Sequence, residues 1–288
     1  MHVLHRLVRF ARKSPREQWR SVRSHLAAMD WYWKIRSPGN DRTVYIIGLF
    51  GSGRNYINEL MAEHIGERTK YFVWHNIRFR RGPTSMIYSG HATMKHRVRG
   101  QAPPALMSRV SEAVRLGFAD LIFIYRHPLD SLLSNWVWWR AIIRDTDANY
   151  ISRAYKNIDD LCAVLEENFS EFKAFADGDP SFFADAQGGR FLSFSEFVEE
   201  TELFLQSATL ALRLEDFAID PLKEFSKIVK VMSVDLDLSR LHVAPPRTKP
   251  YRYLAVKEKV PRFRDFINGL DAETKKRIEK IGYTVGGV

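Results

Sequence analysis

The segment most suited to binding an anion is a glycine-containing turn between an apolar run and a helical pattern. It reads Gly48-Leu-Phe-Gly51-Ser52-Gly53-Arg54-Asn55-Tyr56. Glycines let several backbone N–H groups converge on one point, and a helix N-terminus adds about half a positive charge there. The side chains of Ser52 and Asn55 add donors, and Arg54 adds a charged fork. The segment therefore predicts a cradle for a phosphate or sulfate group.

This cradle differs from the two common nucleotide signatures. No Lys-Ser or Lys-Thr pair follows Gly53, so the turn is not that of a nucleoside triphosphatase, and Arg-Asn-Tyr after Gly53 breaks the GxGxxG pattern. A turn that uses glycine only for steric reasons is the alternative interpretation at this point.

A second strand-to-helix turn carries an arginine and a serine eight residues apart, in Arg126-His-Pro128-Leu-Asp130-Ser-Leu-Leu-Ser134. Arg126 is expected to leave the carboxyl end of a strand, where open α/β sheets bind ligands. Ser134 is expected about two helical turns further on. Both side chains can then reach one phosphate lying along that helix.

With these turns the chain resembles the family of sulfotransferases that use 3′-phosphoadenosine-5′-phosphosulfate (PAPS), and it is nearest in type to bacterial carbohydrate sulfotransferases. The family has a 5′-phosphosulfate loop after its first strand and a 3′-phosphate motif R-x-P-x-D-x-x-x-S, matched from Arg126 to Ser134. The segment from Arg213 to Pro221 is similar to its R-x-E-D-F-x-x-x-P strand end. The segment from Pro261 to Tyr283 resembles its C-terminal basic segment and last helix.

The resemblance implies a P-loop-like sulfotransferase fold of the α/β class, a three-layer α/β/α domain around a mostly parallel sheet, with PAPS as donor and no metal. It also implies the residues that bind the donor, which are Gly51, Ser52, Gly53, Arg54, Asn55, Tyr56, Arg126, Ser134, Arg262 and Arg264. One position departs from the family, which usually has Lys or Arg where this chain has Gly51. Arg54, Lys95 or a C-terminal arginine is the expected substitute for that catalytic cation.

Three residues are candidates for the general base that takes the proton of the acceptor hydroxyl. Glu59 lies eight residues after Gly51, the offset at which glycosaminoglycan sulfotransferases carry a glutamate. His96, directly after Lys95, resembles the histidine of small-molecule sulfotransferases. His91 is the third candidate, and the sequence leaves the choice open.

The alternation of apolar runs and helical patterns predicts a parallel sheet with helices on both faces. We expect one domain over residues 41–288, preceded by a basic helical extension over residues 1–40. The expected strands are Thr43–Phe50, Tyr71–Trp74, Asp120–Tyr125 and Thr209–Leu214. The expected helices after residue 40 begin near Ile57, Pro103, Leu129, Tyr150, Ser193, Asp220 and Asp271.

The net charge of +10 suits an anionic partner, and the run from Arg68 to Arg99 contains no acidic residue. The expected acceptor is a carbohydrate, as a glycolipid, lipopolysaccharide or polysaccharide, and no specific nucleic acid is expected. No run approaches the about 20 apolar residues of a membrane span, so we expect a cytoplasmic protein with the basic helix as a candidate membrane contact. A P-loop-type kinase and a catalytically degenerate nucleotide- or polyanion-binding protein are the alternative functions.

Overall fold

The computed structural model describes most of the chain after residue 41. The described residues are 42–49, 51–64, 66–71, 74–79, 84–92, 95–97, 114–117, 119–143, 157–179, 189–246 and 250–286. The predicted N-terminal extension over residues 1–40 lies outside them, as does most of the helix expected from Pro103.

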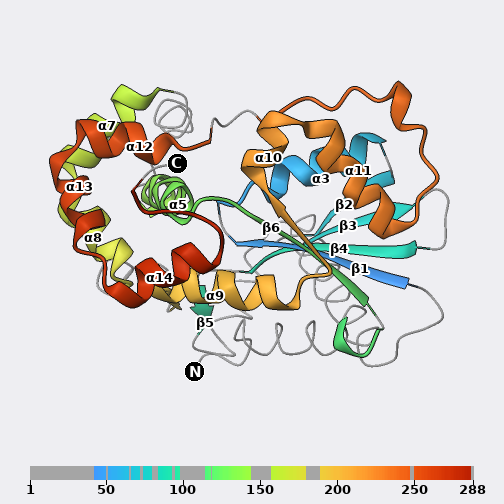
Figure 1. Cartoon of the computed structure of the whole chain (residues 1–288), viewed down its shortest axis with the longest axis horizontal. Helices are drawn as coiled ribbons and strands as arrows, with labels where there is room; N and C mark the ends of the chain where they lie inside the picture. The colour runs from blue at the N-terminus through green and yellow to red at the C-terminus, as the bar shows by residue number, and fades with distance from the viewer. Residues whose placement is uncertain are drawn as a thin grey trace, which may run out of the picture.

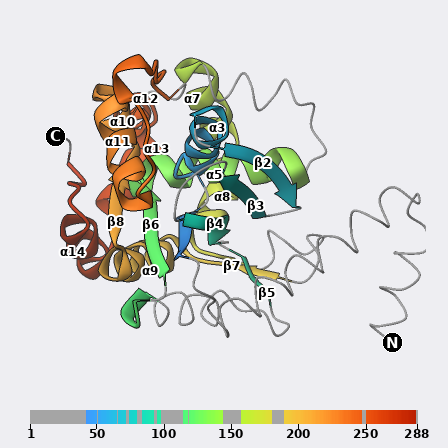
Figure 2. The ribbon, with the colours of Figure 1, turned by 90° about the vertical axis from the view of Figure 1, so that its right-hand side faces the viewer.

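A six-stranded sheet, in the order β2-β3-β4-β1-β6-β8, forms the centre of the fold. Its strands are β1 (Arg42–Leu49), β2 (Gly66–Tyr71), β3 (Trp74–Phe79), β4 (Thr84–Ala92), β6 (Ala119–Tyr125) and β8 (Leu210–Arg213). The strands β4, β1, β6 and β8 run parallel, and β3 and β2 are antiparallel at one edge. The mostly parallel sheet expected from the sequence is confirmed. Two short strands, β5 (Lys95–Arg97) and β7 (Gly189–Phe191), form a separate antiparallel pair, visible in Figure 2.

Helices cover both faces of the sheet (Figure 1). One face is covered by α3 (Arg54–His64), α10 (Leu214–Ile219) and α11 (Pro221–Met232). On the other face, α5 (Pro128–Ile143) and α9 (Phe194–Ser207) pack with the strands. The remaining helices complete the same buried core around α5 and α9, and they are α7 (Ile158–Glu167), α8 (Phe169–Ala176), α12 (Arg252–Lys259), α13 (Pro261–Asn268) and α14 (Ala272–Lys280).

The apolar strands divide their side chains between two cores. In β1, Val44 and Ile46 pack with α3 and α11, whereas Tyr45 and Ile47 pack with α5 and α9. This follows from the geometry of a strand, whose successive side chains point to opposite faces. A strand buried on both faces reads as a continuous apolar run, as this one does. The three-layer α/β/α architecture is confirmed.

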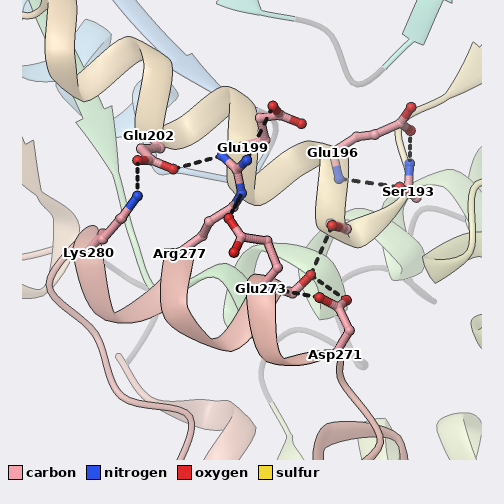
Figure 3. A network of polar contacts seen from close by, with 10 residues as sticks. Ser193, Glu196, Glu199, Glu202, Asp271, Glu273, Arg277 and Lys280 are labelled. Atoms are coloured by element: carbon pink, nitrogen blue, oxygen red, sulfur yellow. Dashed lines mark hydrogen bonds and ion pairs between the residues drawn. The ribbon is translucent and has the colours of Figure 1, made fainter.

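A network of charges holds α14 against α9 (Figure 3). Arg277 of α14 lies 2.8 Å from Glu202 and 3.5 Å from Glu199, both on α9. Helix α9 begins in a capping box between Ser193 and Glu196, which satisfies N–H groups at the start of the helix. These contacts fix the path of the chain just before its C-terminal residues.

The expected strand at Tyr71–Trp74 is wrong. Strand β2 ends at Tyr71, β3 begins at Trp74, and the two residues pair across an antiparallel ladder. The aromatic cluster therefore marks the ends of two strands and not the middle of one. The helix expected from Tyr150 is divided at Asn168, which ends α7 and precedes α8. Helices α12 and α13 were not predicted.

Candidate functional site

The predicted phosphate-binding turns lie at the carboxyl edge of the parallel sheet. The glycine turn follows β1, Arg126 follows β6, and Leu214 follows β8. Strand β1 lies between β4 and β6 in the sheet. The next parallel strand along the chain is β4, on one side of β1, and the one after it is β6, on the opposite side. The carboxyl end of β1 is therefore a topological switch point, the place where open α/β sheets leave a crevice for a ligand.

The glycine turn is packed tightly between two neighbours. Both Gly51 (φ +78°) and Gly53 (φ +88°) adopt left-handed backbone conformations. A Cβ atom on Gly51 would lie 3.1 Å from the carbonyl oxygen of Ser131, and one on Gly53 would lie 2.5 Å from Leu214. The steric interpretation of these glycines therefore holds, and it is compatible with a cradle for an anion.

Ser52 lies at the centre of the turn and is 1% exposed. Its N–H donates to the Leu49 carbonyl at 3.1 Å, whereas its hydroxyl oxygen has no hydrogen-bond partner among the described residues. A buried hydroxyl without a partner costs free energy unless a ligand or water satisfies it. Ser52 thus fits the role of a donor to a bound anion.

The close approach of α5 explains the glycine at position 51. The Cβ position of Gly51 also lies 3.2 Å from the Asn135 side-chain oxygen and 3.3 Å from the Ser131 Cα. A long cationic side chain has no room to leave the backbone at this point without a shift of α5. Position 51 therefore contributes backbone, and no cationic side chain, to this turn.

Arg126 and Ser134, predicted to act together, line the same small pocket. They are 6% and 7% exposed. The Arg126 guanidinium donates to the Asp130 carbonyl at 2.7 Å. The rest of the described lining consists of Asp130, Arg252 and the apolar residues Leu133, Val137 and Leu161.

The charges of this pocket suit a phosphate. Two arginines face one carboxylate, which leaves one net positive charge among its described lining residues. Asp130 is partly engaged, because one of its oxygens accepts from the Tyr253 N–H at 2.8 Å. Its other oxygen lies 4.0 Å from Arg126, so the guanidinium keeps donors for a ligand.

Arg252 was missed by sequence reasoning. It belongs to a basic stretch that includes Arg262 and Arg264, and no spacing distinguishes it. The structure places Arg252 at the start of α12 beside Arg126, whereas Arg262 and Arg264 lie on α13. Arg262 lies 3.9 Å from Glu166 and lines another pocket, of about 600 Å³, between α8, α9, α13 and α14.

The turn after β6 is supported by a buried polar cluster. The His127 N–H donates to one Glu215 oxygen at 2.8 Å, and the Tyr283 hydroxyl donates to the other at 2.8 Å. Burial raises the pKa of Glu215, and the two donors oppose that shift. Burial lowers the pKa of His127 to about 4, although the Thr284 carbonyl favours the charged form. His127 is therefore a neutral imidazole at pH 7.

The candidate bases lie on different elements. Glu59 is exposed on α3, the helix that follows the glycine turn. His91 pairs with Gly48 at the carboxyl end of β4, which places its backbone beside the start of the glycine turn. Lys95 and His96 lie on β5, in the separate two-stranded sheet.

Two of the residues expected to bind the donor have side chains that the structure does not describe, and a third already makes other contacts. The side chains of Arg54 and Asn55 lie outside the described part of the structure. The Tyr56 hydroxyl donates to the Ala244 carbonyl at 2.7 Å, and its ring packs edge-on against Phe217. Tyr56 therefore has an evident structural role.

Neither a metal cluster nor a membrane-spanning helix is found among the described residues. They contain no group of three or more His, Cys, Asp or Glu side chains that is arranged to hold a metal ion. None of the helices in that part of the chain is both long and apolar enough to cross a membrane.

No protein-family model matches the chain, and no curated protein matches it in sequence. Among solved structures, the chain resembles the crystal structure of mouse sulfotransferase SULT7A1 complexed with PAP, with 15% sequence identity, a TM-score of 0.39 and 86% of each chain covered. A likeness of this size decides neither the fold nor the activity of this chain.

Proposed function

We propose that this protein is a sulfotransferase that moves a sulfuryl group from PAPS to a hydroxyl group of a carbohydrate. One observation carries the proposal. Arg126 and Ser134, the two ends of the R-x-P-x-D-x-x-x-S motif, are buried together in one pocket at the carboxyl edge of the sheet. The glycine turn follows the neighbouring strand, and its Ser52 hydroxyl has no hydrogen-bond partner within the part of the chain that the structure describes.

In this proposal the pocket of Arg126, Ser134 and Arg252 binds the 3′-phosphate of the donor. The glycine turn and the N-terminus of α3 bind the 5′-phosphosulfate, where N–H groups and the helix dipole favour negative charge. The donor supplies an activated sulfuryl group whose leaving group is 3′-phosphoadenosine-5′-phosphate. The protein then has to hold the acceptor hydroxyl in line, stabilise the charge on the leaving phosphate and remove the hydroxyl proton.

The base is assigned to one of Glu59, His96 and His91, which keep the roles suggested by the sequence. The cation at the leaving phosphate is assigned to Arg54, Lys95 or a C-terminal arginine, since Gly51 has no side chain to supply it. The carbohydrate acceptor is supported by the offset of Glu59 from the glycine turn. A glycolipid acceptor and a membrane contact through the basic residues before position 40 belong to the same proposal.

A second candidate function is nucleotide binding without transfer. It is favoured by Gly51, because the contact with Ser131 and Asn135 excludes the cation that the family usually places there. Binding and transfer must therefore be measured separately.

The experiment is a pair of assays on the wild type and on Arg126→Ala. Calorimetry gives the affinity for 3′-phosphoadenosine-5′-phosphate, and release of that nucleotide from PAPS in the presence of a polysaccharide mixture gives transfer. Removing Arg126 is expected to weaken binding by about 2–5 kcal/mol, because the charge is buried. Unchanged affinity would refute the site.

Three variants, Glu59→Gln, His96→Ala and His91→Ala, identify the base, since only its loss stops transfer while the nucleotide still binds. Binding without any transfer would favour the second candidate.

A further inference from the structure

Beyond the last paired residues of β6 and β8, a side chain takes the place of a backbone hydrogen-bond partner. Tyr125 and Arg213 are the last partners of β6 and β8. Two residues further on, His127 faces Glu215, and the Glu215 carboxylate accepts the His127 N–H at 2.8 Å. His127 is fully buried and Glu215 is 3% exposed. The carboxylate therefore satisfies a backbone donor that the ladder no longer reaches.

The C-terminal residues complete this contact. The Tyr283 hydroxyl donates to the second Glu215 oxygen at 2.8 Å, and Tyr283 is 5% exposed. The path of the chain into Tyr283 is narrow, because Gly282 has φ +85° and its Cβ position lies 2.1 Å from the Arg213 guanidinium. Only glycine fits at that position without moving Arg213.

The His127 ring is held by the same C-terminal segment. Its Nδ1 accepts from the Leu129 N–H at 3.2 Å, which makes Nε2 the protonated nitrogen, and Nε2 donates to the Thr284 carbonyl at 3.2 Å. The ring stacks on Tyr253 with a centroid distance of 4.0 Å. Both the backbone and the ring of His127 are thus anchored to segments far away in the sequence.

Arg126 stands between the end of β6 and this anchored residue. Its guanidinium donates to the Asp130 carbonyl, four residues away in the first turn of α5, directly after the Arg126-His127 turn. The direction of the Arg126 side chain therefore depends on the backbone of the turn.

We propose that Glu215 and Tyr283 are positioning residues that hold the Arg126-His127 turn and thereby set the selectivity of the pocket for a nucleotide carrying a 3′-phosphate. This inference rests on the proposed function.

The test compares the affinities of 3′-phosphoadenosine-5′-phosphate and ADP, which lacks the 3′-phosphate, by calorimetry. The variants are Tyr283→Phe, which leaves a buried Glu215 oxygen without its donor, and Glu215→Gln, which keeps an acceptor for the His127 N–H. We expect Tyr283→Phe to lower the preference for the bisphosphate about tenfold, and Glu215→Gln to retain it within about threefold. The control is Thr274→Val, which removes a buried hydroxyl from α14 that bonds to Ser195 and Asp271.

A merely structural role would make Tyr283→Phe behave like the control, with a lower melting temperature and an unchanged preference, and that result overturns the inference. Hydrogen exchange of the His127 amide gives a readout without nucleotide, and it is expected to accelerate in Tyr283→Phe but not in Thr274→Val. If the wild type does not prefer the bisphosphate, the proposed function fails. The exchange rate then decides whether Tyr283 anchors the turn, and an unchanged rate overturns the anchoring as well.

Discussion

The packing of the glycine turn against α5 predicts a specific cost for a single methyl group. In Gly51→Ala the alanine backbone must keep φ +78°, a left-handed conformation that costs about 1–2 kcal/mol for an L-residue. Its Cβ also meets Ser131 and Asn135 at 3.1–3.3 Å, and such overpacking costs about 1–3 kcal/mol. The total expected loss in the free energy of unfolding is about 2–5 kcal/mol.

The chain offers a matched control. Gly117 has φ +75°, and its Cβ position has no atom of the described residues within 4 Å. Gly117→Ala therefore bears the backbone strain without the contact, and we expect it to lose only about 1–2 kcal/mol. Thermal unfolding of both variants gives the difference between their losses in unfolding free energy. Each kcal/mol lowers the melting temperature by about 2–4 °C in a domain of about this size.

Equal losses in the two variants would show that α5 does not restrict the turn. The same reasoning predicts that Gly51→Lys does not increase transfer, because its side chain cannot leave the backbone without displacing α5. A Gly51→Lys variant that transfers sulfuryl groups faster than the wild type would refute the account of this position.

Three further predictions concern other parts of the site and fold. Arg252→Ala should weaken binding of 3′-phosphoadenosine-5′-phosphate at least about tenfold, whereas Arg262→Ala should leave it within about twofold, as calorimetry will show; equal effects would contradict the placement of Arg252. The pKa of His127 is lowered to about 4 in the folded protein, below its unfolded value, so its contribution to stability is complete above about pH 6.5 and is lost as the pH falls towards 4. Unfolding measured between pH 4 and 7 should therefore depend less steeply on pH in His127→Phe, and an unchanged slope would be evidence against a buried neutral imidazole. Arg277→Met should destabilise the protein by about 1 kcal/mol, and less so at high salt, because its ion pairs with Glu199 and Glu202 between α14 and α9 are partly exposed; a salt-independent loss would point to packing.

The sequence predicts those parts of the fold that depend on local periodicity. The apolar runs of β1 and β6 are buried on both faces and were placed within one or two residues of their observed ends. Helices α9, α11 and α14 are each preceded by an N-cap residue whose side chain accepts from the first turn, as expected of these residue types, and these residues are Ser193, Asp220 and Asp271. Short-range signals of this kind need no knowledge of the tertiary structure.

The rest depends on contacts between distant segments. The pairing of Arg126 with Ser134 follows from a spacing of eight residues, but Arg252 joins them from more than 100 residues away. Glu215 and Tyr283 are likewise brought to His127 only by the order of the strands and the path of the C-terminal segment. Helices α12 and α13 were missed because Pro261 and a dense run of basic residues interrupt any long apolar pattern.

The central claim is that the pocket of Arg126, Ser134 and Arg252 recognises a 3′-phosphate beside the glycine turn. The most direct test is calorimetric titration of the wild-type protein with 3′-phosphoadenosine-5′-phosphate, ADP and AMP under one salt condition. The account predicts that the bisphosphate binds at least about a hundredfold more tightly than either of the others, as expected for a buried phosphate held by two arginines. Equal affinity for the three nucleotides, or no binding of any of them, would contradict it.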